Sequence, residues 1–561
     1  MGSGFSSEDT IMSIALWHDM NSAALIVGAY AISMILFAVW ARRDLEKDDE
    51  SYFLAGRQLT GPVLLVTMAA TNFSAFTVYG SSGASYKVGL SLLPIMAFGT
   101  GFMAISMYFI GLGVRKRSVQ HGAMTAPEMI RGQTGSREAQ ITMSIVLIAA
   151  TIPYLALQPR AAGIVVSALF GGPEWIGAVL VTVLVVAYTL TGGLKAVVRT
   201  DLLQGIIAVC LLWVGLAMVI KDAGGLDTAM SSLVSSEATS GLLKREGNYD
   251  LLVWTSIMLL WLFADPMFPQ LYQRLCAAEN DRSIGQMATL YPAVAWLAFL
   301  PPILIGTLGN FSHPSLDSSD SILPAMIIDA GGEWLGGLVL VAGLAALMST
   351  MDSQLLATGS LITRDLMSKE EDGVGIRNRE IIIVLLAILG LILSLWSDLS
   401  ILDLGLLAFS MYAVMYPSVF LAVHCEFVDG RAVISSIIAG ESVVMLALFK
   451  PELFEGWWVQ PVGSAMPAAV IPSLAAALFF LLLTNYYLSS EGFGLSIDFS
   501  KSKKIWFPAV SLTIVFIMAQ DFWWWSESQP GLLGMPIWIW WSFALSVIQT
   551  GIMVKWTSEV H

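Results

Sequence analysis

Stretches of roughly 20 mostly apolar residues, separated by short polar segments, recur along the whole chain. A helix of about 20 apolar residues spans the hydrocarbon core of a bilayer. The pattern therefore predicts an all-α polytopic membrane protein. Its fifteen expected spans lie at roughly 22–41, 61–82, 88–113, 138–162, 173–194, 201–221, 251–270, 286–309, 334–362, 380–397, 400–422, 432–449, 466–487, 505–522 and 535–554.

Two of these spans carry hydroxyl and amide residues at mid-membrane depth. They are Val63–Gly80, "VLLVTMAATNFSAFTVYG", and Leu338–Ser360, "LVLVAGLAALMSTMDSQLLATGS". An unpaired polar group in hydrocarbon costs several kcal/mol, so such clusters point to binding or transport. We expect the two segments to form the walls of one cation site.

Composition agrees with a membrane protein, since only 12% of the residues are charged and 56% are hydrophobic. Soluble domains have about 25% charged residues. The net charge of −14 comes with acidic residues in exposed loops, and no basic patch suits nucleic acid. The three cysteines, Cys210, Cys276 and Cys425, imply no disulfide framework.

The positions of Lys and Arg predict the orientation. If the N-terminus lies outside, 22 of the 28 Lys and Arg residues, Arg274 among them, fall in inside segments and five fall outside. This asymmetry follows the positive-inside rule. The odd number of spans then places the C-terminus inside, and we expect a multi-pass protein of the plasma (cytoplasmic) membrane.

Spans two and seven are both interrupted, and this suggests internal symmetry. Span two contains "AATN" and then Gly80, and span seven contains "ADPMFPQ" with Pro266 and Pro269. Each opens a block of five spans, and an odd number of spans per block gives opposite orientations. This pattern is typical of an inverted repeat with a site at the midplane. The expected divisions are 1–60 for the N-terminus with its first helix, 61–222 and 251–425 for the two repeats, and 426–561 for four peripheral helices.

Several segments resemble the sodium:solute symporter family, over roughly residues 25–480. They are "YFLAGRQLTGPVLLVTMAATNFSAFTVYGSSGASYKVGL", "YTLTGGLKAVVRTDLLQG", "QLYQRLCAAEN" and "AGLAALMSTMDSQLLATGSLITRDL". The family includes proline, pantothenate, sialic acid and galactose carriers. The resemblance implies a LeuT-like fold of five plus five inverted helices and sodium-coupled transport by alternating access. Spans fourteen and fifteen exceed the family's usual thirteen, which leaves their role open.

The resemblance implies a sodium ion between span two and span nine. Its ligands would be the carbonyl oxygens of Ala70, Phe73 and Ala346 and the hydroxyls of Ser349 and Thr350. The last three lie at i, i+3 and i+4, so the spacing alone places them on one helix face. Sodium is a hard cation that prefers such oxygen ligands. The alternative is that these hydroxyls bond back to helix carbonyls and only pack the helices.

A second polar group is expected nearer the cytoplasm, at Asp201, Asp352 and Ser353. Some members of the resembled family bind a second sodium near that aspartate and the hydroxyls of span nine. Asp352 departs from the family, in which a hydroxyl is commoner at this position. It could strengthen a second cation site, bind a proton, or pair with a nearby arginine.

The substrate is expected beside the sodium, at the break in span two. Asn72, Ser74 and Thr77 follow the sodium ligands, and Trp261 and Asp265 occupy positions where the proline carrier contacts its substrate. An aspartate there is a departure from that carrier. Asp265 could receive a cationic amine, take a proton, or cap the half-helix.

Arg160 is the cation embedded in a span, and it could hold a carboxylate through a bidentate contact. Its alternative role is to reach the outer interface. Gln158, nearby on the same span, could donate a hydrogen bond to the substrate. This stretch resembles pantothenate and monocarboxylate carriers, and the resemblance implies a small organic acid as the leading substrate, with an amino acid as the alternative.

The expected function is therefore a symporter whose partners are sodium, a small solute and the lipid bilayer, with the oligomeric state left open. The rivals are a sensor that works with a separate signalling partner, a membrane enzyme and a channel. None of the five histidines lies mid-span or in a His-Glu-x-x-His motif, so we expect no enzyme. The two interrupted helices favour alternating access over a channel.

Overall fold

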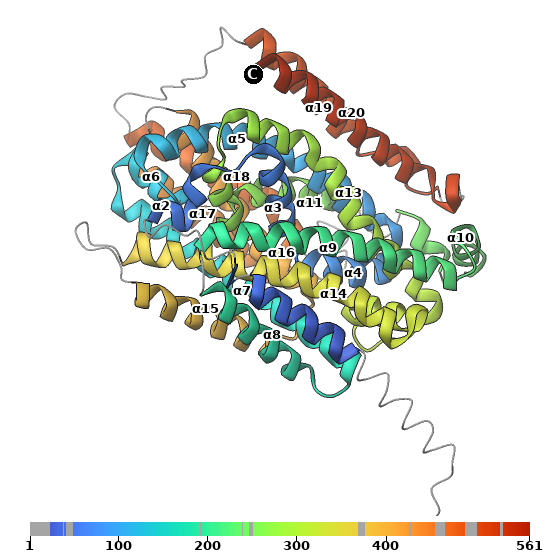
Figure 1. Cartoon of the computed structure of the whole chain (residues 1–561). Helices are drawn as coiled ribbons and strands as arrows, with labels where there is room; N and C mark the ends of the chain where they lie inside the picture. Colours follow the sequence, from blue (N-terminus) through green and yellow to red (C-terminus); the bar gives the residue numbers. More distant parts are fainter. Residues whose placement is uncertain are drawn as a thin grey trace, which may run out of the picture.

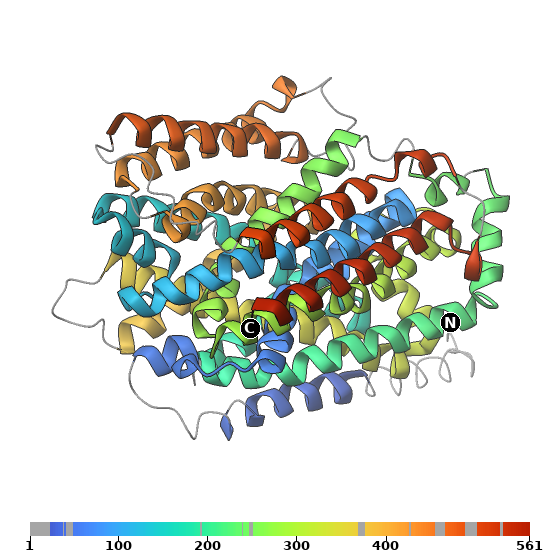
Figure 2. The ribbon, with the colours of Figure 1, turned by 90° about the horizontal axis from the view of Figure 1, so that it is seen from above.

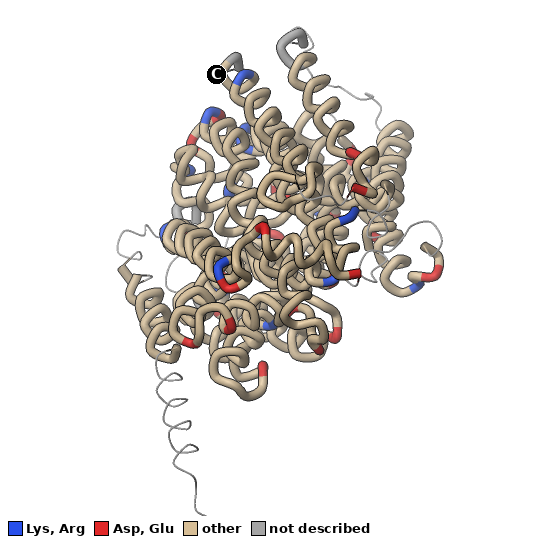
Figure 3. Tube along the Cα trace, turned by 90° about the vertical axis from the view of Figure 1, so that its right-hand side faces the viewer, with Lys and Arg blue, Asp and Glu red and all other residues tan. Residues whose placement is uncertain are grey.

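The computed structural model shows long helices that run roughly along one direction and pack side by side (Figures 1 and 2). It describes residues 23–37, 39–40, 49–190, 193–237, 239–245, 251–367, 376–425, 428–454, 466–488, 502–527 and 531–560. Charged residues are sparse along the trace (Figure 3), as expected for helices that face lipid and one another.

Within the described residues, eleven helices are long and apolar enough to cross a membrane, and two bent pairs raise the number to thirteen. The eleven are α5 (Gly99–His121, which follows the π-helix Pro94–Phe98), α7 (Arg137–Phe170), α9 (Gly193–Asp222), α13 (Asp281–Ser312), α14 (Ile322–Ser360), α15 (Ile376–Trp396), α16 (Ile401–His424), α17 (Gly430–Phe449), α18 (Met466–Leu488), α19 (Ser502–Met518) and α20 (Ile537–Val560).

Shorter helices complete the described chain. Two are apolar, Ala23–Phe37 and α8 (Glu174–Thr189), and they fall where the remaining expected spans lie. Three connect longer elements: α2 (Asp49–Leu54), α6 (Ala126–Thr134) and α10 (Leu226–Ser235).

The first bent pair is the interrupted span two. α3 (Gly61–Asn72) ends at Phe73, whose φ and ψ of −82° and 91° are extended. The chain resumes as the π-helix η3 (Phe76–Gly80) and α4 (Ser81–Val88), and the two halves meet at 62°. The predicted interruption is confirmed. The span runs on to Ser91 rather than ending near residue 82.

The second bent pair is span seven. α11 (Leu251–Ala264) is followed by the short 3₁₀ turn η7 (Asp265–Met267) and by α12 (Pro269–Ala277), with a bend of 57°. Pro266 and Pro269 lack the backbone N–H groups that a continuous helix needs, so the helix breaks where the sequence predicts.

The loop expected at 310–333 is partly helical. α14 begins at Ile322, and Gly332 adopts a left-handed φ of 62° that separates its first turns from the long segment behind it. The apolar run "ILPAMII" is too short to span a bilayer, so a criterion based on the length of apolar runs places it in a loop between two spans.

The last two helices are packed onto the body of the protein. Trp296 on α13 donates to the Ser546 hydroxyl of α20 (2.8 Å), and Gln549 of α20 donates to the Gly101 carbonyl of α5 (2.9 Å). Arg245 and Asp521 form an ion pair that is almost fully buried, with side chains 1% and 0% exposed. These contacts tie α19 and α20 to α5, α13 and the segment before α11.

Candidate functional site

The end of α3 meets the middle of α14 through backbone carbonyls and hydroxyls. The Ser349 Oγ lies 3.1 Å from the Ala70 carbonyl oxygen, and the Thr350 Oγ1 lies 3.0 Å from that of Thr71. Thr350 also lies 3.2 Å from the Ala346 carbonyl. The structure therefore brings together four of the five expected sodium ligands, with Thr71 as an additional oxygen.

The Ser349 hydroxyl has a single proton, and its shortest contact is with Asp201 Oδ1, at 2.6 Å. When the proton points at this carboxylate, the Ser349 and Ala70 oxygens face each other with only lone pairs. Two such oxygens at close range suit a cation that both can ligate.

Phe73, the fifth expected ligand, lies at the break itself. In a continuous helix its carbonyl would accept the Thr77 N–H, but that N–H donates to Ser74 instead (3.0 Å). Phe73, Ala70 and Ala346 line one apolar crevice of about 230 Å³ between α3, α9 and α13. Among the described residues, no three His, Cys, Asp or Glu side chains form a metal cluster.

A buried ion pair lies beside this oxygen cluster. Arg274 on α12 places Nη2 2.6 Å from Asp201 Oδ2 on α9, and neither side chain has any exposed surface. Thr67 of α3 accepts from Arg274 Nε (2.9 Å) and donates to Asp201 (2.6 Å). Arg274 therefore links α12, α9, α3 and α14, the last through Ser353 (2.8 Å). Arg274, counted above among the Lys and Arg residues of the inside segments, is therefore fully buried and paired.

The three residues expected at a second cation site are neighbours through this network. Ser353 is 3.3 Å from Asp352 Oδ1, and Arg274 Nη2 lies between Ser353 and Asp201. Asp352 Oδ2 is buried without a hydrogen-bond partner. The cluster thus holds two carboxylates and one guanidinium, all fully buried.

Of the expected substrate residues, Asn72, Asp265 and Trp261 lie at the two helix breaks. Asn72 Nδ2 donates to Asp265 Oδ2 (3.0 Å) and to the Tyr291 hydroxyl of α13 (2.9 Å). This contact joins the broken end of α3 to the broken end of α11, two residues after Ala70.

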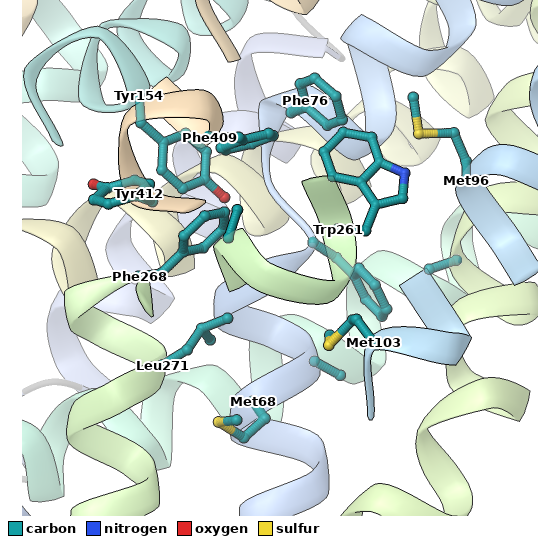
Figure 4. Packing of buried hydrophobic residues seen from close by; sticks show 14 of the residues in the cluster. Met68, Phe76, Met96, Met103, Tyr154, Trp261, Phe268, Leu271, Phe409 and Tyr412 are labelled. Carbon is teal, nitrogen blue, oxygen red and sulfur yellow. The ribbon is translucent and has the colours of Figure 1, made fainter. Parts of the chain in front are cut away.

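Aromatic rings gather around Phe409 (Figure 4). The Phe409 ring of α16 has its centroid 4.9–5.5 Å from the centroids of four other rings. Those four rings belong to Phe76, Tyr154, Trp261 and Phe268. The Trp261 Nε1 has no hydrogen-bond partner.

The other expected substrate residues have different contacts. Gln158 Oε1 accepts from the Ala75 N–H (3.1 Å) and the Ser74 Oγ accepts from the Phe76 N–H (3.1 Å), so both satisfy backbone groups freed by the break. Thr77 lines the apolar crevice. Arg160 donates to the Ser397 carbonyl after α15 (2.7 Å), rather than to the break in α3.

The family to which this architecture belongs follows from the sequence, since the model of the sodium:solute symporter family matches residues 52–440. The chain belongs to the sodium:solute symporter family. Among its relatives, the sodium/pantothenate symporter of Escherichia coli (strain K12) is 25% identical over 474 residues, covering 82% of this chain and 96% of that protein. The osmoregulated proline transporter OpuE of Bacillus subtilis (strain 168) is 25% identical over 440 residues, covering 75% of this chain and 87% of that protein.

A solved structure supports the fold. A sodium-coupled sialic acid symporter, in a substrate-bound outward-open state, matches with a TM-score of 0.68 at 16% identity, over 83% of this chain and 98% of that one. As a member of the sodium:solute symporter family, the protein is a multi-pass membrane transporter with a LeuT-like fold, and sodium is its coupling ion.

Sequence reasoning missed several residues of this symporter's central region. Arg274, Thr67 and Tyr291 join the polar network, and Phe409 joins the rings. Arg274 lies in the segment "QLYQRLCAAEN", where its charge indicates only an inside position. Its place on the short helix α12, directly after a helix break, is the signal that points to burial. Phe409 carries no signal, because an aromatic residue in an apolar span is ordinary.

Proposed function

We propose that the protein imports a small organic solute, an organic acid or an amino acid, by sodium-coupled symport with alternating access across the cytoplasmic membrane. The observation that supports this most is the contact between the Ala70 carbonyl and the Ser349 hydroxyl, at the break of α3. It joins two helices at a group of oxygens suited to sodium.

We propose fifteen spans, with the N-terminus outside and the C-terminus inside, and two inverted repeats at 61–222 and 251–425. The two broken helices support this division, since each opens one of the blocks. Residues 1–60 would precede the repeats, and 426–561 would form four further helices, of which α19 and α20 brace α5 and α13.

In this proposal the carbonyls of Ala70, Phe73 and Ala346 and the hydroxyls of Ser349 and Thr350 bind sodium. Sodium holds α3 and α14 together and so favours the state in which the substrate residues are assembled. Coupling requires sodium to bind that state more tightly than the inward-open one. When α3 moves away from α14, the ligand set divides between two helices and sodium leaves.

The second cation site, at Asp201, Asp352 and Ser353, is a separate proposal. A second ion would share Asp201 with Arg274, whose Nη2 already contacts Asp201 and Ser353. Asp352 supports it, because it is fully buried and the two carboxylates outnumber the one guanidinium.

We place the substrate at the junction of the two breaks, with Asn72, Trp261 and Asp265 as direct contacts. Ser74 and Gln158 shape the site through the backbone that they satisfy. Thr77 lies on the crevice side of the break. Arg160 on α7 would hold a substrate carboxylate only after leaving the Ser397 carbonyl to which it donates.

Counterflow tests the proposal directly. Purified protein in proteoliposomes is loaded with an unlabelled solute, and entry of the same labelled solute is followed with sodium or with potassium. A sodium-dependent overshoot is expected. A protein that binds solute and sodium but gives no overshoot is a receptor, and that result would overturn the carrier assignment.

A further inference from the structure

Asp265 is a buried carboxylate at the substrate junction with no cationic partner. Its side chain is 4% exposed, and no ion pair within the described residues includes it. Arg160 and Arg274 have other partners: Arg160 donates to the Ser397 carbonyl, and Arg274 pairs with Asp201. A buried charge without a partner is costly, so such a carboxyl group either takes up a proton or is completed by a cationic ligand.

The junction keeps a small accessible surface, unlike the ion pair beside it. Asn72 is 9% exposed and Asp265 4%, whereas Asp201 and Arg274 are 0% exposed. The neutral Asn72 amide of α3 donates to the Asp265 carboxylate, and the same amide donates to the Tyr291 hydroxyl of α13. The Asp265 side chain is thus held in place by a neutral group, with no cationic side chain against it among the described residues.

The neighbouring surface is aromatic. Trp261 lies four residues before Asp265 and Phe268 three residues after it, and both contact the Phe409 ring, with centroids 5.5 and 4.9 Å away. Tyr154 also contacts Phe409, at 4.9 Å. A carboxylate with aromatic neighbours on both sides along the chain suits an ammonium ion, because ring faces attract the cation and the carboxylate neutralises it.

We propose that the transported solute carries an ammonium group, which pairs with Asp265 and lies against the rings of Trp261 and Phe409. This inference rests on the proposed symport and narrows its substrate to zwitterions and amines. A carboxylic acid without an ammonium group would meet a like charge at Asp265. Phe409 packs among the other rings in this conformation (Figure 4), so we expect its ring to turn and make room for the ammonium group that it then contacts.

The same contact explains how solute and sodium assist each other. Asn72 connects Asp265 to the chain two residues beyond Ala70. An ammonium bound at Asp265 therefore orders the junction that also positions the Ala70 and Phe73 carbonyls. Each ligand lowers the cost of ordering the site for the other, which is positive coupling.

Matched pairs of probes test the proposal, because they differ only in the charged nitrogen. Proline is compared with cyclopentanecarboxylate, glycine betaine with 3,3-dimethylbutanoate, and choline with 3,3-dimethylbutanol. Thermal stabilisation of the purified full chain is measured for each, with sodium and with potassium. In sodium, at least one nitrogen-bearing member should bind at least about tenfold more tightly than its partner.

Three variants refine the test. Asp265→Asn should abolish the preference, Asp265→Glu should keep part of it, and Asp403→Asn, a carboxylate held by Ser400 at the start of α16, should leave it unchanged. Equal or tighter binding of the nitrogen-free members, or no response to any ammonium probe, overturns the proposal. Sodium-dependent stabilisation by the nitrogen-free acids would overturn the ammonium proposal and leave the symport proposal intact. If no solute stabilised the protein more in sodium than in potassium, the symport proposal itself would be refuted.

Discussion

Replacing Arg274 with alanine should open the cytoplasmic side of the protein. Arg274 holds α12 against three other helices through Asp201 (2.6 Å), Ser353 (2.8 Å) and Thr67 (2.9 Å). The replacement removes all three contacts and leaves the Asp201 carboxylate buried without a cation. Breaking one partner of a buried ion pair costs about 3–5 kcal/mol.

The native Cys276 reports this opening, since it lies on the same helix two residues later and is 0% exposed. In a background with Cys210→Ala and Cys425→Ala, the labelling of Cys276 by a membrane-impermeant maleimide measures how often α12 moves away. A weakening of about 3–5 kcal/mol raises the open fraction by roughly 10²- to 4 × 10³-fold, because each 1.4 kcal/mol is tenfold. Sodium should slow labelling of the parent protein.

Two controls separate gating from unfolding. Arg431→Ala breaks an ion pair with Asp429 whose side chains are 67% and 21% exposed, and such pairs contribute about 0–1 kcal/mol, so labelling should stay unchanged. Arg274→Ala with Asp201→Ala removes the unpaired charge and should recover part of the slow labelling. Unchanged labelling in a monodisperse Arg274→Ala protein would refute the role assigned to the ion pair.

Further predictions concern packing and the C-terminal helices, and the midpoint of thermal unfolding in detergent measures both. Gly343→Ala should lower stability by about 1–3 kcal/mol, because its Cβ would lie 1.7 Å from the Tyr79 hydroxyl oxygen, whereas Gly359→Ala, with its nearest atom at 3.5 Å, should be neutral. Equal midpoints for the two would contradict the close approach of η3 and α14. Arg245→Ala should lower stability by about 3–5 kcal/mol, because it leaves Asp521 buried without its cation, whereas Arg245→Met with Asp521→Leu should lower it much less. An unchanged midpoint for Arg245→Ala would show that this ion pair does not hold α19 and α20 in place.

The sequence predicts the features that depend on local chemistry. The two helix breaks follow from prolines and from a polar run in an apolar span, and the face shared by Ala346, Ser349 and Thr350 follows from helical spacing. These features persist in the structure because neighbours along the chain determine them.

The remaining features depend on contacts between residues far apart in the chain. Arg274 and Asp201 are 73 positions apart, and Asn72 and Tyr291 are 219 apart. Nothing in either local sequence names its partner. For the same reason, the sequence around Arg160 does not reveal that its partner is the Ser397 carbonyl, and it allows the expected carboxylate-binding role.

Equilibrium binding of radioactive sodium to the purified protein tests the central claim most directly. The parent protein should bind sodium saturably, with higher affinity when a transported solute is present. A protein with Ser349→Ala and Thr350→Ala should lose this binding while it keeps a monodisperse, helical fold. Sodium binding at parental affinity in that variant would contradict a sodium site between α3 and α14.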